Sequence, residues 1–388
     1  MNELALLGGE VTFPQGIPFV RPPAPTLERV TEILGESWKR GSLTNGALVA
    51  ELERRAAEYL GVPHVVAVSS CTTGLMLALR ALEVDGPVVM PSFTFSASAH
   101  AVAWNGGTPR FAECDPSSFQ LAVGDATAHV PNATAMLATH IFGAPCRARE
   151  LTELARSHEI PLVFDAAHAF GALHDGVPVG GFGDAEVFSL TPTKPLVAGE
   201  GGLVATTRDD VAYKVRIGRD YANPGNYDTE FVGLNGRMSE MHAATALASL
   251  EGFEANQSRR FEIVERYRVR LSEIPGVRVQ SVAPEDRSTW KDFTIAIDRA
   301  HFGVDRNELR RALTADGVDT RTYFDPPVHR QRAYRDIESG PLPITDAACS
   351  SVLSLPVYPA LDDRTVDGIV ELIARVHDKS ADFGGGVG

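Results

Sequence analysis

Two residues with reactive or ionisable side chains each follow an apolar, strand-like run of the chain. Asp165 comes directly after residues 162–164, and Lys194 stands a short turn beyond residues 185–189. A lysine amine can form a Schiff base with an aldehyde, and an ionised carboxylate can hold a protonated ring nitrogen through charge-assisted pairing. The pair therefore indicates an aldehyde cofactor. For Asp165 alone, capping of a following helix is the alternative.

A small polar turn supplies a candidate phosphate site. Residues 69–74 join a β-branched run to the start of a helix. Free backbone N–H groups at a helix N-terminus bind anions, so we expect Cys71 and Thr72 to donate to a phosphate. Simple helix capping is the alternative for an isolated turn of this kind. Taken with Asp165 and Lys194, the turn indicates pyridoxal 5'-phosphate (PLP).

Three more side chains could complete a cofactor site. Ser189 leaves the same run as Lys194 and could add a hydroxyl to the phosphate site. Phe95 follows a predicted strand and could stack on a planar ring, although a core position is the alternative for both Phe95 and Phe93. His168 could support the nearby carboxylate or the ring oxygen of the cofactor, and a structural histidine is its alternative.

The elements that must position these residues alternate in type. Alternating strands and helices predict an α/β fold with a mostly parallel sheet, whose ligands bind beyond the carboxyl ends of the strands. Asp165 and Lys194 lie at such ends. The predicted strands cover residues 65–68, 88–90, 110–112, 135–139, 162–164 and 185–189. The predicted helices cover residues 26–39, 51–60, 75–82, 97–105 and 147–158.

A second α/β segment is expected after two long helices. We divide the chain into residues 1–260, with an extended proline-rich arm and the large cofactor-binding domain, and residues 261–388, a smaller C-terminal domain. A disordered tail is predicted from about residue 380, where the sequence becomes glycine-rich. The predicted elements of this part are helices at 237–251, 254–274, 306–315 and 364–376 and strands at 290–297 and 320–323.

Composition narrows the class of protein. The 388 residues are 44% apolar and 22% charged, which is ordinary for a globular protein with a core. A net charge of −14 disfavours nucleic acid as a partner. Four cysteines without a C-x-x-C pair give no reason to expect a metal site. The absence of a signal peptide or a long apolar run predicts a cytoplasmic protein without a membrane partner.

Several motifs, in order, resemble the DegT/DnrJ/EryC1/StrS sugar aminotransferase family. The resemblance runs from about residue 17 to residue 376. It implies a fold-type-I PLP-dependent transferase, with a large domain built on a mostly parallel seven-stranded sheet and a smaller C-terminal α/β domain. It also implies a homodimer with shared active sites. The motifs are residues 43–46, 91–95, 164–168, 189–194, 199–202, 233–240 and 353–359.

The resemblance also assigns roles. Lys194 becomes the Schiff-base lysine, Asp165 the partner of the ring nitrogen and Phe95 the stacking aromatic. Asn235 would reach the phosphate of the neighbouring subunit, although a simple turn residue is the alternative. The implied phosphate ligands are Cys71, Thr72 and Ser189.

Two positions depart from the family pattern, and a third bears on the type of reaction. Cys71 stands where the family usually has glycine, and it would be strained if that glycine had a positive φ. Gly236 stands where tyrosine is frequent, which would alter a wall that faces the substrate. Some relatives carry histidine at the position of Lys194 and dehydrate sugars, so lysine here argues against that chemistry.

The resemblance implies an aminotransferase that acts by a ping-pong Schiff-base mechanism. The donor would be L-glutamate or glutamine, and the acceptor a keto-sugar linked to a nucleotide diphosphate, as in making deoxyaminosugars for antibiotics or polysaccharides. Arg237 or Arg321 could pair with a diphosphate or a donor carboxylate. A free keto-cyclitol acceptor and a PLP-binding regulatory protein of low turnover are the alternatives.

Other substrate contacts are expected near both ends of the chain. Thr44 and Asn45 precede a helix and could bind a sugar hydroxyl, with helix capping as the alternative. Tyr323 and His329 lie where relatives shape the substrate side. For each of these residues a structural or surface role competes with the functional one.

Overall fold

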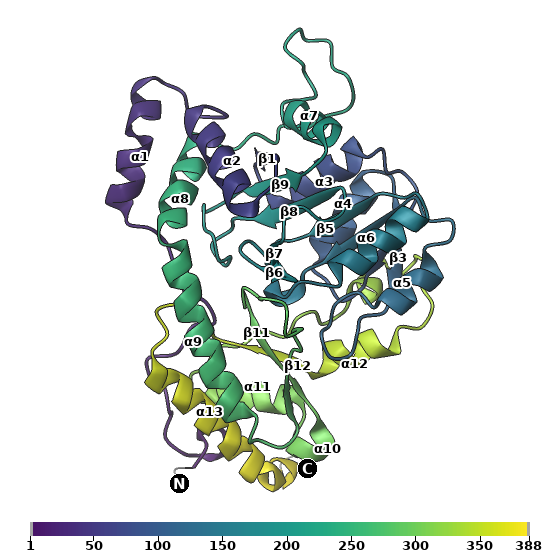
Figure 1. Cartoon of the computed structure of the whole chain (residues 1–388). Coiled ribbons are helices and arrows are strands. Elements are labelled where there is room, and N and C mark those ends of the chain that lie inside the picture. The colour runs from purple at the N-terminus through teal and green to yellow at the C-terminus, as the bar shows by residue number, and fades with distance from the viewer. Residues whose placement is uncertain (1–2, 386–388) are drawn as a thin grey trace.

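The main sheet of the computed structural model, which describes residues 3–385, contains seven strands (Figure 1). Their order is β1-β9-β8-β5-β4-β2-β3. The pairs from β8 to β3 are parallel, whereas β9 runs antiparallel to both of its neighbours. The predicted mostly parallel sheet is confirmed. The strands are β1 (His64–Val68), β2 (Pro87–Pro91), β3 (Thr108–Ala112), β4 (Ala135–Thr139), β5 (Leu162–Asp165), β8 (Ala185–Ser189) and β9 (Gly202–Thr206).

Helices cover both faces of this sheet, which is why its strands are mostly apolar. One face packs against α3 (Cys71–Ala81), α4 (Ser96–Trp104) and α7 (Asp209–Gly218). The other packs against α2 (Ala47–Leu60), α5 (Val123–His129), α6 (Ala148–Ser157) and α8 (Glu240–Glu251). The helix α1 (Leu27–Lys39) begins after Thr26, whose side chain accepts a hydrogen bond from the Arg29 N–H.

A glycine sets how closely α3 approaches the sheet. A Cβ at Gly74 would stand 2.7 Å from Val187 on β8 and 3.0 Å from Val204 on β9. Only glycine permits so close an approach. The close packing brings the first turn of α3 to the carboxyl edge of the sheet.

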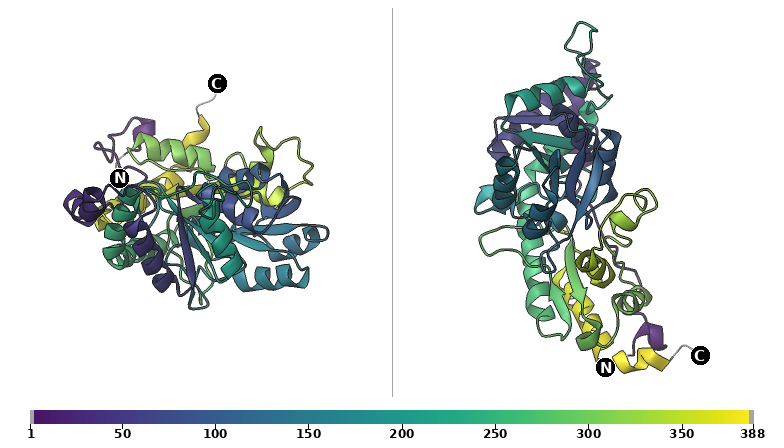
Figure 2. Two further views of the ribbon diagram at one scale, coloured as in Figure 1. Left: turned by 90° about the horizontal axis from the view of Figure 1, so that it is seen from above. Right: turned by 90° about the vertical axis from the view of Figure 1, so that its right-hand side faces the viewer.

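The C-terminal part is built on a small antiparallel sheet in the order β10-β11-β12. The right-hand view of Figure 2 shows this part, in green and yellow, below the large sheet. Within residues 3–385, no helix is long and apolar enough to span a membrane. The strands are β10 (Val277–Val279), β11 (Phe293–Ile297) and β12 (Val352–Leu355). The helices are α9 (Phe253–Leu271), α10 (Arg299–Phe302), α11 (Arg306–Ala315), α12 (Pro343–Ser351) and α13 (Asp363–Asp378). A two-stranded ribbon, β6 (Leu173–His174) and β7 (Val177–Pro178), lies between β5 and β8 in the sequence.

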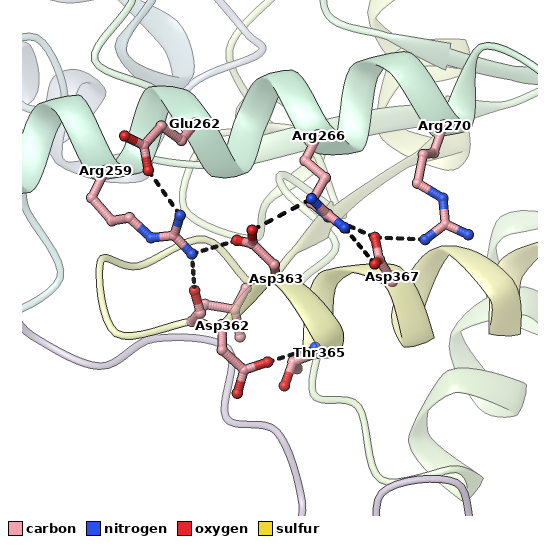
Figure 3. A network of polar contacts seen from close by, with 9 residues as sticks. Arg259, Glu262, Arg266, Arg270, Asp362, Asp363, Thr365 and Asp367 are labelled. Carbon is pink, nitrogen blue, oxygen red and sulfur yellow. Dashed lines mark hydrogen bonds and ion pairs between the residues drawn. The ribbon is translucent and has the colours of Figure 1, made fainter.

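A row of ion pairs joins α9 to α13 across the surface of this part (Figure 3). Arg259 and Arg266 of α9 contact Asp363 at 2.7 and 3.4 Å, and Arg266 and Arg270 each contact Asp367 at 2.6 Å. The pairs are partly exposed, so each contributes at most about 1 kcal/mol to stability. Their i, i+4 spacing on α13 matches the arginine spacing along α9 and fixes the register of the two helices.

Two predicted elements are wrong. Residues 320–323 form no strand, because Arg321 makes only an isolated bridge to Ser354 before the chain turns into two prolines. The tail is ordered further than predicted, since Ser380–Gly385 form a 3-10 helix and Phe383 packs against the core. Residues 386–388 lie outside the described part of the chain.

The boundary predicted near residue 260 falls within α9, and the division into two domains stays a prediction.

Three element boundaries also shift. The helix expected over residues 237–251 begins at Glu240, because Ser239 caps it by accepting the His242 N–H at 3.2 Å. The strand expected over residues 290–297 begins only at Phe293. The helix expected from residue 51 already begins at Ala47.

The early start of α2 depends on a carboxylate from another helix. Glu240 is fully buried and accepts hydrogen bonds from the N–H groups of Gly46, Leu48 and Val49, each at 3.0 Å. Its fourth partner is the hydroxyl of Ser37 on α1, at 2.7 Å. Glu240 thus satisfies the free donors of α2 and joins three helices at one point.

Replacing Glu240 with alanine should lower the free energy of unfolding by about 3 kcal/mol, because three N–H groups at the start of α2 lose a buried, charged acceptor. The matched control is Glu36→Ala on the exposed side of α1, where Glu36 pairs only with Lys39 and Arg40. Thermal or urea unfolding measures both changes. A loss for Glu240→Ala as small as that of the control would contradict this account of the cap.

Candidate active site

A cavity of about 380 Å³ lies at the carboxyl edge of the main sheet. Its walls come from the segments that follow β1, β2, β4, β5 and β8, together with two loops of the C-terminal part. This is the position at which open α/β sheets bind ligands. Eight of the predicted site residues line it: Cys71, Thr72, Phe95, Asp165, His168, Ser189, Lys194 and Tyr323.

Asp165 ends β5 and is buried on the cavity wall. Its carboxylate accepts hydrogen bonds from the Ser98 hydroxyl at 2.6 Å and from the Ala167 N–H at 3.1 Å. Burial raises the pKa of Asp165, while these two hydrogen bonds and the nearby Lys194 act in the opposite direction. A buried carboxylate of this kind needs a cation beside it to stay ionised, and a protonated ring nitrogen is such a cation.

Lys194 reaches the same cavity from the loop after β8, where its N–H donates to the Thr191 carbonyl at 3.0 Å. Burial and, after it, the positive charge of Lys291 lower the pKa of Lys194 to about 8, against the opposing charge of Asp292. A lysine with a pKa of about 8 carries a substantial fraction of free amine near neutrality. It can therefore act as a nucleophile or as a base.

The first turn of α3 forms the third side of the cavity. Cys71 is the first helical residue and has no positive φ, so the strain considered for this replacement of glycine does not arise. Ser70 caps the helix by accepting the Thr73 N–H at 3.0 Å. Cys71 and Thr72 line the cavity, and their N–H groups lie in the first turn of α3, where no helical acceptor is available and an anion can bind. Burial raises the pKa of the Cys71 thiol well above its usual range.

The structure separates the two aromatic candidates. Phe93 is fully buried among other aromatic rings, whereas Phe95 lines the cavity and is 61% exposed. An exposed ring at the mouth of a cavity is available to stack on a planar ligand. Ser189, at the end of β8, also lines the cavity, and its hydroxyl lies 3.3 Å from the Thr191 hydroxyl.

His168 lines the cavity as a neutral ring. Its Nδ1 accepts the Phe142 N–H at 3.2 Å, which leaves the ring proton on Nε2. Burial and the charges of Lys194 and Lys291 hold the pKa of His168 well below its ordinary value. The ring can therefore donate one hydrogen bond to a ligand oxygen without adding a charge.

Several predicted substrate residues lie away from this cavity. The Thr44 hydroxyl donates to the Met238 carbonyl at 3.2 Å, and the Asn45 N–H donates to the same carbonyl at 3.0 Å. His329 makes a 2.7 Å hydrogen bond with Ser92. Helix capping, the alternative role considered for Thr44 and Asn45, is performed by Glu240 instead.

The segment before α8 also lies outside the cavity wall. Asn235 is exposed and its backbone bridges to Asp220, which pairs with Arg237. Arg237 also lies over the ring of Tyr221 at 5.5 Å. A Cβ at Gly236 would stand 2.7 Å from Thr73, so this residue packs against α3 and forms no part of the cavity wall.

Sequence reasoning missed Ser98 and Lys291. Ser98 comes one turn of helix after the Phe93–Phe95 motif, and its contact with Asp165 depends on the packing of α4 against β5. Lys291 and Asp292 did carry a signal, because two adjacent charges in an otherwise apolar run are unusual. The strand predicted over residues 290–297 takes account of the apolar residues of this segment alone.

Comparison with known proteins places this site among sugar-modifying enzymes. Residues 26–374 match the model of the DegT/DnrJ/EryC1/StrS aminotransferase family. The dTDP-3-amino-3,4,6-trideoxy-alpha-D-glucose transaminase of Streptomyces venezuelae is 35% identical, over 84% of this chain and 86% of that protein. The GDP-perosamine synthase of Caulobacter vibrioides is 32% identical, over 85% and 90%. The crystal structure of DesI with its TDP-sugar product is 36% identical, with a TM-score of 0.93 and 98% of both chains covered.

The amine of Lys194 should titrate near pH 8 in protein freed of cofactor, because burial and the charge of Lys291 destabilise its protonated form. The chain has five lysines, so carbon-13 methylation followed by NMR titration can resolve each one. Loss of one resonance in Lys194→Ala assigns the signal. A titration near the ordinary lysine pKa of about 10.4 would contradict the described environment.

Proposed function

This chain belongs to the DegT/DnrJ/EryC1/StrS aminotransferase family, whose enzymes depend on PLP, and from this we propose a specific reaction for it. It moves an amino group from L-glutamate or glutamine to the ketone of a sugar linked to a nucleotide diphosphate. The observation that carries the proposal is the meeting of Asp165, Lys194 and the first turn of α3 around one cavity.

The residues present fit the cofactor. Asp165 would hold its ring nitrogen, since a buried carboxylate with a raised pKa gains from an adjacent cation. The amides of Cys71 and Thr72, with the hydroxyl of Ser189, would hold its phosphate. Phe95 would cover one face of the ring, and the Nε2 proton of His168 is placed to meet an oxygen.

When bound, PLP supplies the aldehyde carbon that carries the amino group from donor to acceptor. Lys194 then has two tasks, which its lowered pKa serves. It holds the cofactor through its side-chain nitrogen, and once released it moves a proton to and from the donor's α-carbon as a general base and acid. The donor product leaves before the acceptor reacts, so ping-pong kinetics are expected.

The acceptor is proposed from the relatives. Those named above act on sugars linked to dTDP, GDP or TDP according to their names, and they match nearly the full length of this chain. Roles for Thr44, Asn45, Arg237, Tyr323 and His329 in binding the sugar stay predictions. Tyr323 is the one of the five on the cavity wall.

A homodimer with shared sites belongs to this proposal, as does a cytoplasmic location. The loop between α7 and α8 projects from the body of the molecule (Figure 1). It presents apolar side chains to solvent, with Tyr227 93% and Val232 78% exposed. Exposed apolar groups of this kind favour a protein contact. Asn235, at the base of the same loop, is exposed and available to a second subunit.

The purified protein should show a visible absorption band of bound cofactor that L-glutamate bleaches. Lys194→Ala should fail to give this conversion, because the amine that binds the cofactor and moves the proton is lost. Lys214→Ala, at a surface lysine paired with Glu83, is the matched control and should behave like the wild type. A band that no amino donor changes would favour a regulatory protein. No band after addition of PLP would contradict the proposed function.

Shared sites predict that two defective chains can restore each other. Lys194→Ala and Asn235→Ala, expressed with different tags and purified as hybrids, should recover roughly half of the wild-type activity if Asn235 crosses to the other subunit. One site of each hybrid is then intact. If Asn235 acts within its own chain, every site keeps one defect and the hybrid stays as inactive as the parent variants.

The class of acceptor is tested separately. Keto-sugars linked to a nucleotide diphosphate and free keto-cyclitols, each supplied as the acceptor, identify the substrate class.

A further inference from the structure

A second lysine shares the wall of the cavity with Lys194. Lys291 is 6% exposed, and its neighbour Asp292 is 1% exposed. The ammonium group contacts both carboxylate oxygens of Asp292 at 2.8 and 2.9 Å, and it lies 5.4 Å from the centre of the Tyr323 ring. A buried ion pair costs desolvation energy and adds little net stability, so its presence on a cavity wall calls for another explanation.

The loop that carries Lys291 is firmly held. The Thr289 hydroxyl donates to the His168 carbonyl at 2.6 Å, and the Thr289 N–H donates to the Gly143 carbonyl at 3.0 Å. Trp290 has a φ of 49°, an unusual conformation for a bulky residue, and its carbonyl accepts from the guanidinium of Arg260 at 3.2 Å. Strain of this kind persists where the surroundings fix a side chain for function.

The ammonium group of Lys291 retains a donor for a ligand. It has three N–H bonds, of which two face Asp292, and the third is free to point into the cavity. Within residues 3–385, Lys194 and Lys291 are the two cationic side chains on the cavity wall, because His168 is neutral. Arg237 and Arg321, the cations considered from sequence, are instead engaged with Asp220 and Asp319.

We propose that Lys291 binds a carboxylate of the amino donor and thereby positions the donor beside Lys194. This inference rests on the proposed function and deepens it. An amino acid brings at least one carboxylate into the cavity, whereas Lys194 is committed to the cofactor and to proton transfer. Lys291 is the remaining cation on the wall, and its two contacts with Asp292 orient it.

The same arrangement separates the two half-reactions. The reacting ring of a keto-sugar carries no carboxylate, so it gains nothing from a fixed cation at this place. The donor and its 2-oxo acid product each carry a carboxylate, and both gain from this cation. Loss of Lys291 should therefore weaken the binding of the donor and leave the binding of the acceptor unchanged. The Tyr323 ring beside the ammonium group offers an apolar contact to either substrate.

The first measurement is calorimetric binding of glutarate, a dicarboxylate without an amine, to the cofactor-loaded protein. Lys291→Met should raise the Kd roughly 10- to 100-fold, the loss expected for a hydrogen bond to a charged group. Because this variant leaves Asp292 buried without a partner, the double variant Lys291→Met/Asp292→Asn is measured beside it. It should show a similar rise, and Lys291→Arg should recover part of the binding.

The second measurement follows the cofactor spectrum in single turnovers. For Lys291→Met, the L-glutamate concentration needed for half-maximal conversion should rise by a similar factor. The conversion of the aminated cofactor by the keto-sugar should keep its wild-type concentration dependence. Unchanged glutarate binding, or equal losses with both substrates, would overturn the proposal for Lys291. A wild-type protein that fails to convert with any donor would instead overturn the proposed function.

Discussion

The site depends on one electrostatic constraint, which is the burial of the Asp165 carboxylate at the end of β5. A carboxylate in this position is destabilised unless a positive charge is beside it. The Ser98 hydroxyl and the Ala167 N–H orient it without neutralising it. The cavity therefore selects a ligand that brings its own cation, and it places that cation where the parallel strands of the sheet end.

The remaining charges of the cavity are arranged around this point. The charge of Lys291 disfavours the protonated form of Lys194, and Asp292, which contacts the ammonium group of Lys291 at 2.8 and 2.9 Å, acts in the opposite direction. The consequence is a division of labour between two lysines. Lys194 has a lowered pKa and is the reactive amine, whereas Lys291 is held by a carboxylate. His168 adds a hydrogen-bond donor to this set without adding charge.

Local sequence signals predicted most of the large sheet and the residues at its carboxyl edge. Short apolar runs followed by polar residues indicated β5 and β8, and with them Asp165 and Lys194. Contacts between segments distant in the sequence could not be predicted in this way. Glu240 caps α2 from a helix far along the chain, and the pairing of Ser98 with Asp165 requires α4 to be packed on the sheet. The strand predicted over residues 320–323 failed for the same reason, since the only pairing found there is an isolated bridge from Arg321 to Ser354 on β12.

The antiparallel strand β9 has a consequence for the lysine loop. The Ser189 and Gly202 ends of β8 and β9 are paired, so the segment that carries Lys194 leaves the sheet and returns to it at the same place. Both ends of that loop are anchored to adjacent strands, and a Cβ at Gly202 would already stand 2.7 Å from the Cys71 nitrogen. Insertions or deletions in the loop would move the reactive amine relative to the ring-binding carboxylate. Evolution of new substrate preferences in this architecture should therefore alter the length of other connections and keep that of the lysine loop constant.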